Sequence, residues 1–597
     1  MRILSLPLAA AAALALAGTA RAQQPLNLGF EMESTARPGR PWGMTATSEP
    51  AMQATFALDS VVRREGRRSL RIDSPEGTAS ADMTIGLATP VAAGKTLRLT
   101  GWIRTRDVKG YAGLAAGEQV PGKEPVTDSM PERGATGTRD WTRFELSFRV
   151  DSAVEWAWIG VGLRGAGTAW FDGLELEMDG ARVDAIPGPP PPTPGELAWL
   201  RRRAFPLATV DAGAPSGDLQ PLRALVGDAR VVALGESTHG TSEFFRAKHR
   251  LAEFLVREMG FNLFALEANQ LQTERVNRYV LGLDGGDART AIRGLFRVWQ
   301  TEEVVALVDW MRAWNESGRG RVEFVGYDMQ DPRLPMDSVH AFLSRVDPAY
   351  LAAADSAYAS MRAAWAAEMY PQRPDSVLRG WREGAERVRA YLTAHRDAYL
   401  RRAEPAAVEW AVQNANVAYQ SAVLRSPGAW RTRDSAMAVN LEWAMRQRPG
   451  SRAIVWAHNA HVARLEPWMG WHLARLHPAD MRVIGLTTYE GRYAAALDYT
   501  RDARARQMAP VALFPGPPGS LEDALHRLGL PILVADLRGA GDDRAGRWLT
   551  LPRPARGIGW LADDYGFDPV NVARAYDAVL QVDRTTASRL LPEPPPR

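Results

Sequence analysis

The chain has 597 residues, of which 46% are hydrophobic and 24% are charged, and its formal net charge is +3. A single hydrophobic core stops growing near ~250–300 residues, so we expect two or three domains. The small net charge gives little support for a nucleic-acid partner, and we expect none. Cysteine is absent, which excludes disulfides, thiolate catalysis and cysteine-ligated metal sites.

The N-terminal segment predicts export. It has one early positive charge, an apolar run and the small-x-small ending Ala20-Arg21-Ala22, which is typical of a secretion signal over residues 1–22 that is cleaved before Gln23. An uncleaved anchor is the alternative, but the apolar run is shorter than the roughly 20 residues that a membrane-spanning helix needs. We therefore expect a periplasmic or extracellular protein with no membrane span after signal removal.

Residues 23–185 contain short alternating segments such as SLRIDS, TLRLTGWIRT and WAWIGVGL, separated by Gly, Pro and Asp turns. This pattern predicts an all-β sandwich. The region resembles the jelly-roll, carbohydrate-binding-module-like domains that accompany secreted enzymes, which implies a carbohydrate partner. Four tryptophans are candidates for stacking on a sugar, although alternating tryptophans in a sandwich more often belong to the core: Trp102, Trp156, Trp158 and Trp170.

The run IPGPPPPTPGE, residues 186–196, predicts a stiff, extended linker. In residues 197–597 the pattern changes to continuous apolar runs separated by amphipathic stretches, which indicates an α/β domain with a mostly parallel sheet and flanking helices. Long amphipathic segments over about 347–447 predict a helical insertion in that domain.

Ionisable side chains follow three of the predicted strands. VVAL leads into Glu236, Ser237 and His239; NLFAL ends at Glu267; AIVWA is followed by His458, Asn459 and His461. Because ligand sites of parallel sheets form at the carboxyl ends of the strands, we expect one shared crevice. Each residue also has a structural interpretation: Glu236 and Ser237 suit a helix start, and a lone histidine is commonly structural.

The segments GESTHGTSEFFRAKHRLAEFLVREMGFNLFALEAN, VGYDMQ and VWAHNAHVAR resemble the signature segments of the erythromycin esterase family, over roughly residues 200–590. The resemblance implies hydrolysis of an ester or lactone, such as the lactone of macrolide antibiotics, a reaction that confers antibiotic resistance. It also implies that the reaction needs no serine nucleophile, metal or cofactor.

By the same resemblance His239 is the general base that activates water, with Glu236 and Glu267 orienting it and His458 as a second catalytic histidine. The matching segments also supply Asn459, His461, Tyr327 and Asp328 as substrate-binding or supporting residues. Two alternatives stay open. One is a metal-dependent hydrolase that uses the same His and Glu cluster, and the other is a non-catalytic ligand-binding protein.

Lys248 is the only lysine after the Pro-rich run, in a chain that otherwise uses arginine there. In a helix from about residue 242 to 259 it falls on the apolar stripe. A buried ammonium needs a counter-charge, so we predict that Lys248 pairs with Glu236 or Glu267, while a snorkelling surface lysine is the alternative. Arginine is common at the matching position of the family.

Overall fold

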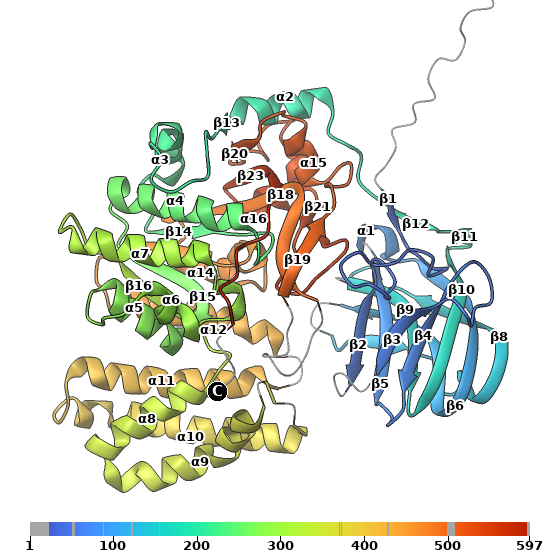
Figure 1. The fold of residues 1–597 in the computed structure, drawn as a ribbon, viewed down its shortest axis with the longest axis horizontal. Helices are drawn as coiled ribbons and strands as arrows, with labels where there is room; N and C mark the ends of the chain where they lie inside the picture. The colour runs from blue at the N-terminus through green and yellow to red at the C-terminus, as the bar shows by residue number, and fades with distance from the viewer. Residues whose placement is uncertain are drawn as a thin grey trace, which may run out of the picture.

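A computed structural model describes residues 23–49, 54–87, 89–120, 123–154, 156–368, 370–371, 373–426, 429–497 and 508–593. The predicted secretion signal lies outside these residues. Figure 1 shows an all-β unit, coloured blue, beside a larger α/β unit that carries a bundle of helices at its lower edge. Within the described part of the chain, no helix is long and apolar enough to cross a membrane.

The all-β unit is built from antiparallel strands around one hydrophobic cluster. In β5 (Ser80–Leu87) every second residue is buried, as expected for a strand with one face on a core. Its other elements are β1 (Gln23–Pro25), β2 (Thr45–Glu49), β3 (Thr55–Asp59), β4 (Ser69–Ser74), α1 (Thr89–Ala92), β6 (Thr96–Gln119), β7 (Val126–Asp128), β8 (Ala135–Arg149), β9 (Trp156–Arg164), β10 (Gly167–Met178), β11 (Ala181–Arg182) and β12 (Ala185–Pro187).

The Pro-rich connection is shorter than the sequence predicts. Its first residues belong to β12, which pairs with β1, and its last residues belong to α2 (Pro194–Arg203). Thr193 and Glu196 form a capping box, and proline is well tolerated in the first turn of a helix because its missing N–H has no partner there. Only residues 188–193 lie between the two elements.

The α/β unit contains a sheet in the order β13-β20-β23-β18-β14-β17-β15-β16, with β19 beside β18. The pairs β14/β17, β14/β18, β15/β16, β15/β17 and β18/β23 are parallel, whereas β13, β19 and β20 pair antiparallel to their neighbours. The strands are β13 (Ala204–Pro206), β14 (Val231–Leu234), β15 (Leu263–Asn269), β16 (Glu323–Asp328), β17 (Ala453–Trp456), β18 (Met481–Ala496), β19 (Met508–Leu513), β20 (Ile532–Asp536) and β23 (Ala578–Thr585), and a separate hairpin is formed by β21 (Arg553–Arg556) and β22 (Phe567–Val570).

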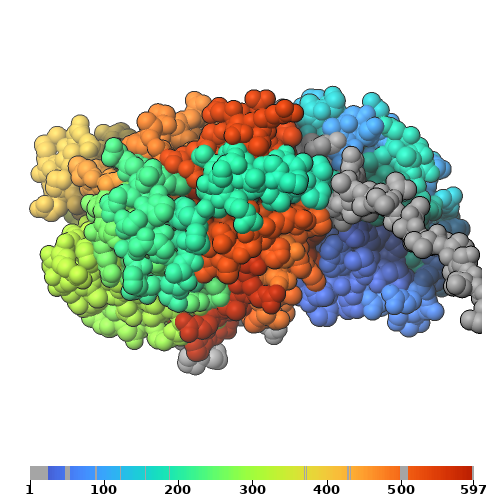
Figure 2. Space-filling model, turned by 90° about the horizontal axis from the view of Figure 1, so that it is seen from above, coloured from blue at the N-terminus to red at the C-terminus, as the bar shows by residue number. Residues whose placement is uncertain are grey.

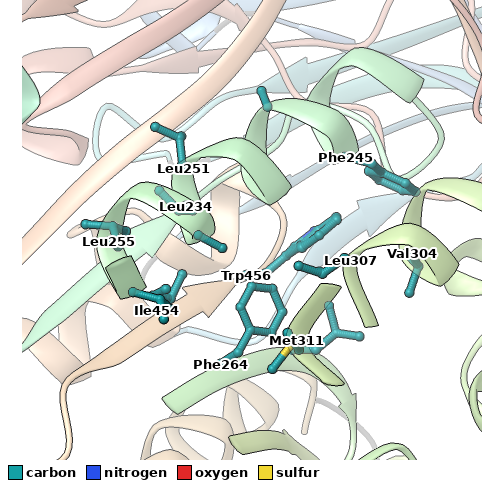
Figure 3. Close-up of a cluster of buried hydrophobic side chains, with 14 of the residues drawn as sticks. Leu234, Phe245, Leu251, Leu255, Phe264, Val304, Leu307, Met311, Ile454 and Trp456 are labelled. Carbon is teal, nitrogen blue, oxygen red and sulfur yellow. The ribbon is translucent and has the colours of Figure 1, made fainter. Parts of the chain in front are cut away.

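Both faces of this sheet are covered. Along β14, Val232 and Leu234 belong to one apolar cluster, and Val231 and Ala233 belong to another. Figure 3 shows the first cluster, where Leu251 and Leu255 of α4 lie on the side of Leu234 and Ile454, and the Trp456 ring of β17 lies beside Phe264. Continuous apolar runs are therefore explained by burial on two faces.

Helices cover the sheet and extend from it. Those around the sheet are α3 (Gln220–Val226), α4 (Ser242–Met259), α5 (Glu274–Val280), α6 (Ala288–Ala291), α7 (Glu302–Glu316), α13 (Asn459–Val462), α14 (Met469–Leu476), α15 (Leu521–His526) and α16 (Val572–Ala575). Between β16 and β17 the chain forms a helical block with its own apolar cluster: α8 (Arg333–Val346), α9 (Pro348–Ala367), α10 (Asp375–Tyr399), α11 (Pro405–Leu424) and α12 (Trp430–Arg446). The block begins before the predicted residue 347, because α8 already packs against α9 and α11.

Candidate functional site

The carboxyl ends of β14, β15 and β17 converge on one cavity of about 1540 Å³. The three strands are adjacent in the sheet, so residues far apart in the sequence lie together. Four of the predicted site residues line the cavity: His239, Glu267, His458 and His461. The ring centroids of His239 and His458 are 5.2 Å apart.

Glu236 orients the His239 ring through a contact with Nδ1. Its Oε1 lies 2.8 Å from Nδ1 of His239, and its other oxygen accepts hydrogen bonds from Lys248 Nζ at 2.8 Å and Trp456 Nε1 at 2.9 Å. A carboxylate that accepts two other donors favours the tautomer in which Nδ1 of the imidazole carries the proton. The unprotonated Nε2 of His239 is then available on the ring that lines the cavity.

Lys248 is fully buried, and its Nζ lies 4.4 Å from the centre of the Trp456 ring. Burial lowers the pKa of Lys248 to about 8, although the nearby Glu236 opposes that shift. Of the two carboxylates that the sequence offered as partners, Glu236 is the one in contact. The pair is part of the apolar layer under the site, where an unpaired charge is costly.

Glu267 is the centre of a second buried ion pair. Its Oε1 accepts from Arg433 Nη2 at 2.8 Å, and its Oε2 accepts from the backbone N–H of His458 at 3.0 Å. Burial raises the pKa of this carboxyl, but the charges of His461, His239 and Arg433 outweigh it and hold the pKa well below the usual range. Glu267 therefore stays ionised beside the histidines.

The two histidines after β17 differ in environment. Burial, and the charges of His239 and His461, lower the pKa of His458 to about 3, so its ring is neutral and its Nε2 donates to the Ile558 carbonyl at 3.2 Å. Burial also opposes protonation of His461, but Glu267 and Asp434 outweigh it and raise the pKa of His461. Nδ1 of His461 lies 2.7 Å from Asp434.

The other predicted site residues support the framework. Asp328 accepts from Arg433 at 2.7 Å, and the Tyr327 hydroxyl donates to the Trp456 carbonyl at 2.7 Å. The Asn459 amide joins the end of β17 to the Leu486 carbonyl at 2.9 Å. None of the three is among the described residues that line the cavity.

Ser237, the hydroxyl side chain between Glu236 and His239 in the loop after β14, is fully buried. Its hydroxyl has no hydrogen-bond partner among the described residues, and it does not line the cavity. A serine nucleophile needs an adjacent base and access to substrate, and Ser237 has neither here.

Sequence reasoning missed Arg433, Asp434 and Trp299. Arg433 and Asp434 lie on α12 in the helical block, so nothing in their local pattern marks them as neighbours of the sheet edge. Trp299 donates through Nε1 to the Glu267 carbonyl at 2.9 Å and meets the His239 ring edge-on, with centroids 5.2 Å apart. No strand-end signal identifies it, because it sits in a short 3₁₀ turn.

The described residues contain no group of three or more histidine, aspartate or glutamate side chains arranged to hold a metal ion. The carboxylate oxygens of Glu236 and Glu267 are already taken by Lys248, Trp456, Arg433 and the His458 N–H. A buried imidazole oriented by a carboxylate, with its second nitrogen open to a cavity, is suited to general-base chemistry.

The comparisons with known proteins concern the α/β unit. The family model described as Erythromycin esterase matches residues 256–585, which include Glu267 and His458 and begin after the loop of Glu236 and His239. Erythromycin esterase type II of Escherichia coli is 24% identical over 428 residues, covering 66% of this chain and 99% of that protein. YbfO of Bacillus subtilis (strain 168) is 23% identical over 428 residues, covering 66% of this chain and 92% of that protein.

Solved structures share the fold. A Bacillus cereus protein has a TM-score of 0.59 at 24% identity, and the match covers 67% of this chain and 100% of that chain. A substituted erythromycin esterase, EreC, in its open conformation has a TM-score of 0.52 at 18% identity, covering 64% of this chain and 97% of that chain. The family match spans more than half of the sequence, and the chain belongs to the erythromycin esterase family.

Proposed function

We propose that this protein hydrolyses a carboxylic ester or lactone with water that His239 activates. The observation that carries the proposal is the contact of Glu236 with Nδ1 of His239, which leaves Nε2 free on the cavity side. Nε2 takes a proton from water as the water oxygen attacks the ester carbonyl. The carbon–oxygen bond to the alcohol then breaks, and the alcohol oxygen takes the proton back from His239.

The tetrahedral intermediate needs positive charge near its oxygen. Arg433 and His461 line the same cavity, and Nη1 of Arg433 lies 3.0 Å from Nε2 of His461. We assign Arg433, whose charge is permanent, to polarising the carbonyl, with the His461 ring accepting from its Nη1. His458 is neutral and is bonded to the Ile558 carbonyl, so its role in the proposal is to position the loop and to donate a hydrogen bond, not to accept a proton.

The test is hydrolysis by the purified full chain of a panel containing macrolide lactones, small lactones and aryl esters of short acids, followed by mass spectrometry. The proposal expects turnover of at least one class, with a product that has gained one water. Turnover of macrolides would assign the protein to antibiotic inactivation. No turnover of any class would favour the ligand-binding alternative.

Dialysis against a chelator separates water activation by histidine from the metal-dependent alternative. The proposal expects the chelator-treated protein to keep its activity, since the base is an imidazole that needs no ion. Activity that is lost with the chelator and restored by a divalent metal would favour the metal-dependent hydrolase.

We further propose that the protein is exported, from the signal pattern in residues 1–22. N-terminal sequencing of protein recovered outside the cytoplasm should find Gln23 or a close neighbour as the first residue. A retained Met1 would contradict the proposal.

A further inference from the structure

A second cavity, of about 800 Å³, lies between the all-β unit and the hairpin of β21 and β22. None of its lining residues lines the catalytic cavity. The two units are in direct contact around it, as the space-filling view shows for the blue and orange-red surfaces (Figure 2). Ala36 donates its backbone N–H to Asp564, and the Trp42 and Tyr565 rings meet edge-on with centroids 6.2 Å apart. We call this cavity the interdomain cleft.

Two tryptophans of β9 form one wall of the interdomain cleft. Trp156 lies over Gly86, where an added Cβ would come within 2.4 Å of the indole, and Trp158 lies over Gly117, where the distance would also be 2.4 Å. Only glycine leaves room for either ring against the neighbouring strand. Trp156 is 45% exposed, which is unusual for so large an apolar side chain.

The other two tryptophans nominated by the sequence are covered. Arg64 stacks on Trp102 at 4.5 Å, and Arg106 stacks on Trp170 at 5.3 Å. Within the described part of the chain, the rings of Trp156 and Trp158 have no aromatic or cationic partner of this kind. Their surface in the interdomain cleft is therefore available to a ligand.

The opposite wall carries Asp568, Tyr565 and Phe567. The Asp568 side chain is solvent-exposed and forms no hydrogen bond or ion pair with the described residues, while Asp82 across the cleft is paired with Arg164 at 2.9 Å. A carboxylate on the cleft wall that has no protein partner offers its oxygens to the hydroxyls of a ligand.

We propose that the interdomain cleft binds a neutral carbohydrate chain, with sugar rings stacked on Trp156 and Trp158 and hydroxyls bonded to Asp568. An indole offers a large, rigid apolar face to the C–H face of a sugar ring, and a few polar groups then fix its orientation. A cationic ligand is less well suited, because Arg164 already supplies positive charge beside Asp82.

The interdomain cleft is connected to the catalytic cavity through one loop. Gly559 and Trp560 line the catalytic cavity, and Asp563 and Tyr565 line the interdomain cleft. Binding of a carbohydrate in the cleft would therefore keep the catalytic cavity close to that carbohydrate chain, whichever ester the enzyme cleaves. This binding does not depend on the hydrolytic proposal.

Affinity electrophoresis of the full chain tests the inference, in gels that contain soluble xylan, mixed-linkage β-glucan or galactomannan. We expect at least one polysaccharide to retard the protein, and Trp156→Ala and Trp158→Ala each to weaken that retardation about tenfold, the scale of one lost aromatic contact. Asp568→Asn should weaken it less, because the amide keeps hydrogen-bonding capacity. His239→Ala should bind as the parent does.

Trp102→Ala is the matched control, since that ring lies under Arg64 outside the cleft and its loss should leave retardation unchanged. A cooperative thermal unfolding transition shows that each variant is folded. If Trp158→Ala does not fold, Trp158→Phe replaces it in the binding assay. Lack of retardation by all three polysaccharides would overturn the proposal. Equal retardation of the parent and of the folded Trp156→Ala and Trp158→Ala variants would also overturn it. A third contrary result would be that choline, a cation, binds in the cleft and no free sugar does.

Discussion

Lys248 and Glu236 form an ion pair in which both side chains are fully buried, with Nζ 2.8 Å from Oε2. The Lys248 ammonium is the buried counter-charge of the carboxylate that contacts His239. The pair joins helix α4 to the loop after β14. Loss of this contact is therefore expected to affect both the packing of α4 and the orientation of His239. The position of the pair explains why a charged side chain lies on the buried stripe of α4.

Replacing Lys248 with methionine should lower the free energy of unfolding by ~3–5 kcal/mol, because Glu236 would keep its buried charge without a counter-charge. Chemical denaturation of parent and variant measures the change. Lys248→Arg should do less harm, since the guanidinium keeps the charge. Lys123→Met is the control, because its ion pair with Asp151 is exposed and worth little. A Lys248→Met protein as stable and active as the parent would refute this role.

Arg433→Met should reduce both stability and ester turnover. The substitution leaves the buried carboxylates Glu267 and Asp328 without their shared partner and removes positive charge from the cavity wall. Turnover measured on a small aryl ester, together with the unfolding midpoint, checks the prediction. Arg446→Met on the same helix is the matched control, because Arg446 is exposed. Unchanged turnover in a folded Arg433→Met protein would contradict the assignment.

The sequence predicts the strand-end residues because each of them directly follows an apolar run, and parallel strands bring such ends together. It also predicts that Lys248 is buried, from its place on the apolar stripe of α4. Arg433 could not be found in this way. It reaches Glu267 from a helix 166 residues further along the chain, and that contact depends on how the helical block folds back on the sheet.

The stability of the protein should fall on acidification through the titration of His458. The pKa of His458 is about 3 in the folded chain, below its ordinary value of 6.5, so the unfolded state binds the proton first between these values. The contribution is complete above pH 6.5 and is lost as the pH falls towards 3. His458→Gln should flatten the dependence of unfolding free energy on pH by up to about 1.4 kcal/mol per pH unit. His472→Gln is the control, and an equal slope in parent and His458→Gln would contradict the account.

Substrate charge should affect binding at the catalytic cavity. Its described lining includes six arginines against the three carboxylates Glu267, Asp331 and Glu593. Of two aryl esters that differ by a remote carboxylate, the anionic one should have a severalfold lower KM at low ionic strength, and salt should reduce the difference. Arg275→Gln at the exposed rim should shrink it. A lower KM for the neutral ester at low salt would contradict this prediction.

In the proposed mechanism His239 activates water and Ser237 does not attack the ester. The most direct measurement is the turnover of His239→Ala and Ser237→Ala beside the parent, on one ester and at one pH, with unfolding midpoints to show that each is folded. We expect His239→Ala to lose at least ~10²-fold in kcat, the lower range for a positioned general base, and Ser237→Ala to stay substantially active. Near-parental turnover of a folded His239→Ala protein, or loss of activity confined to Ser237→Ala, would contradict the account.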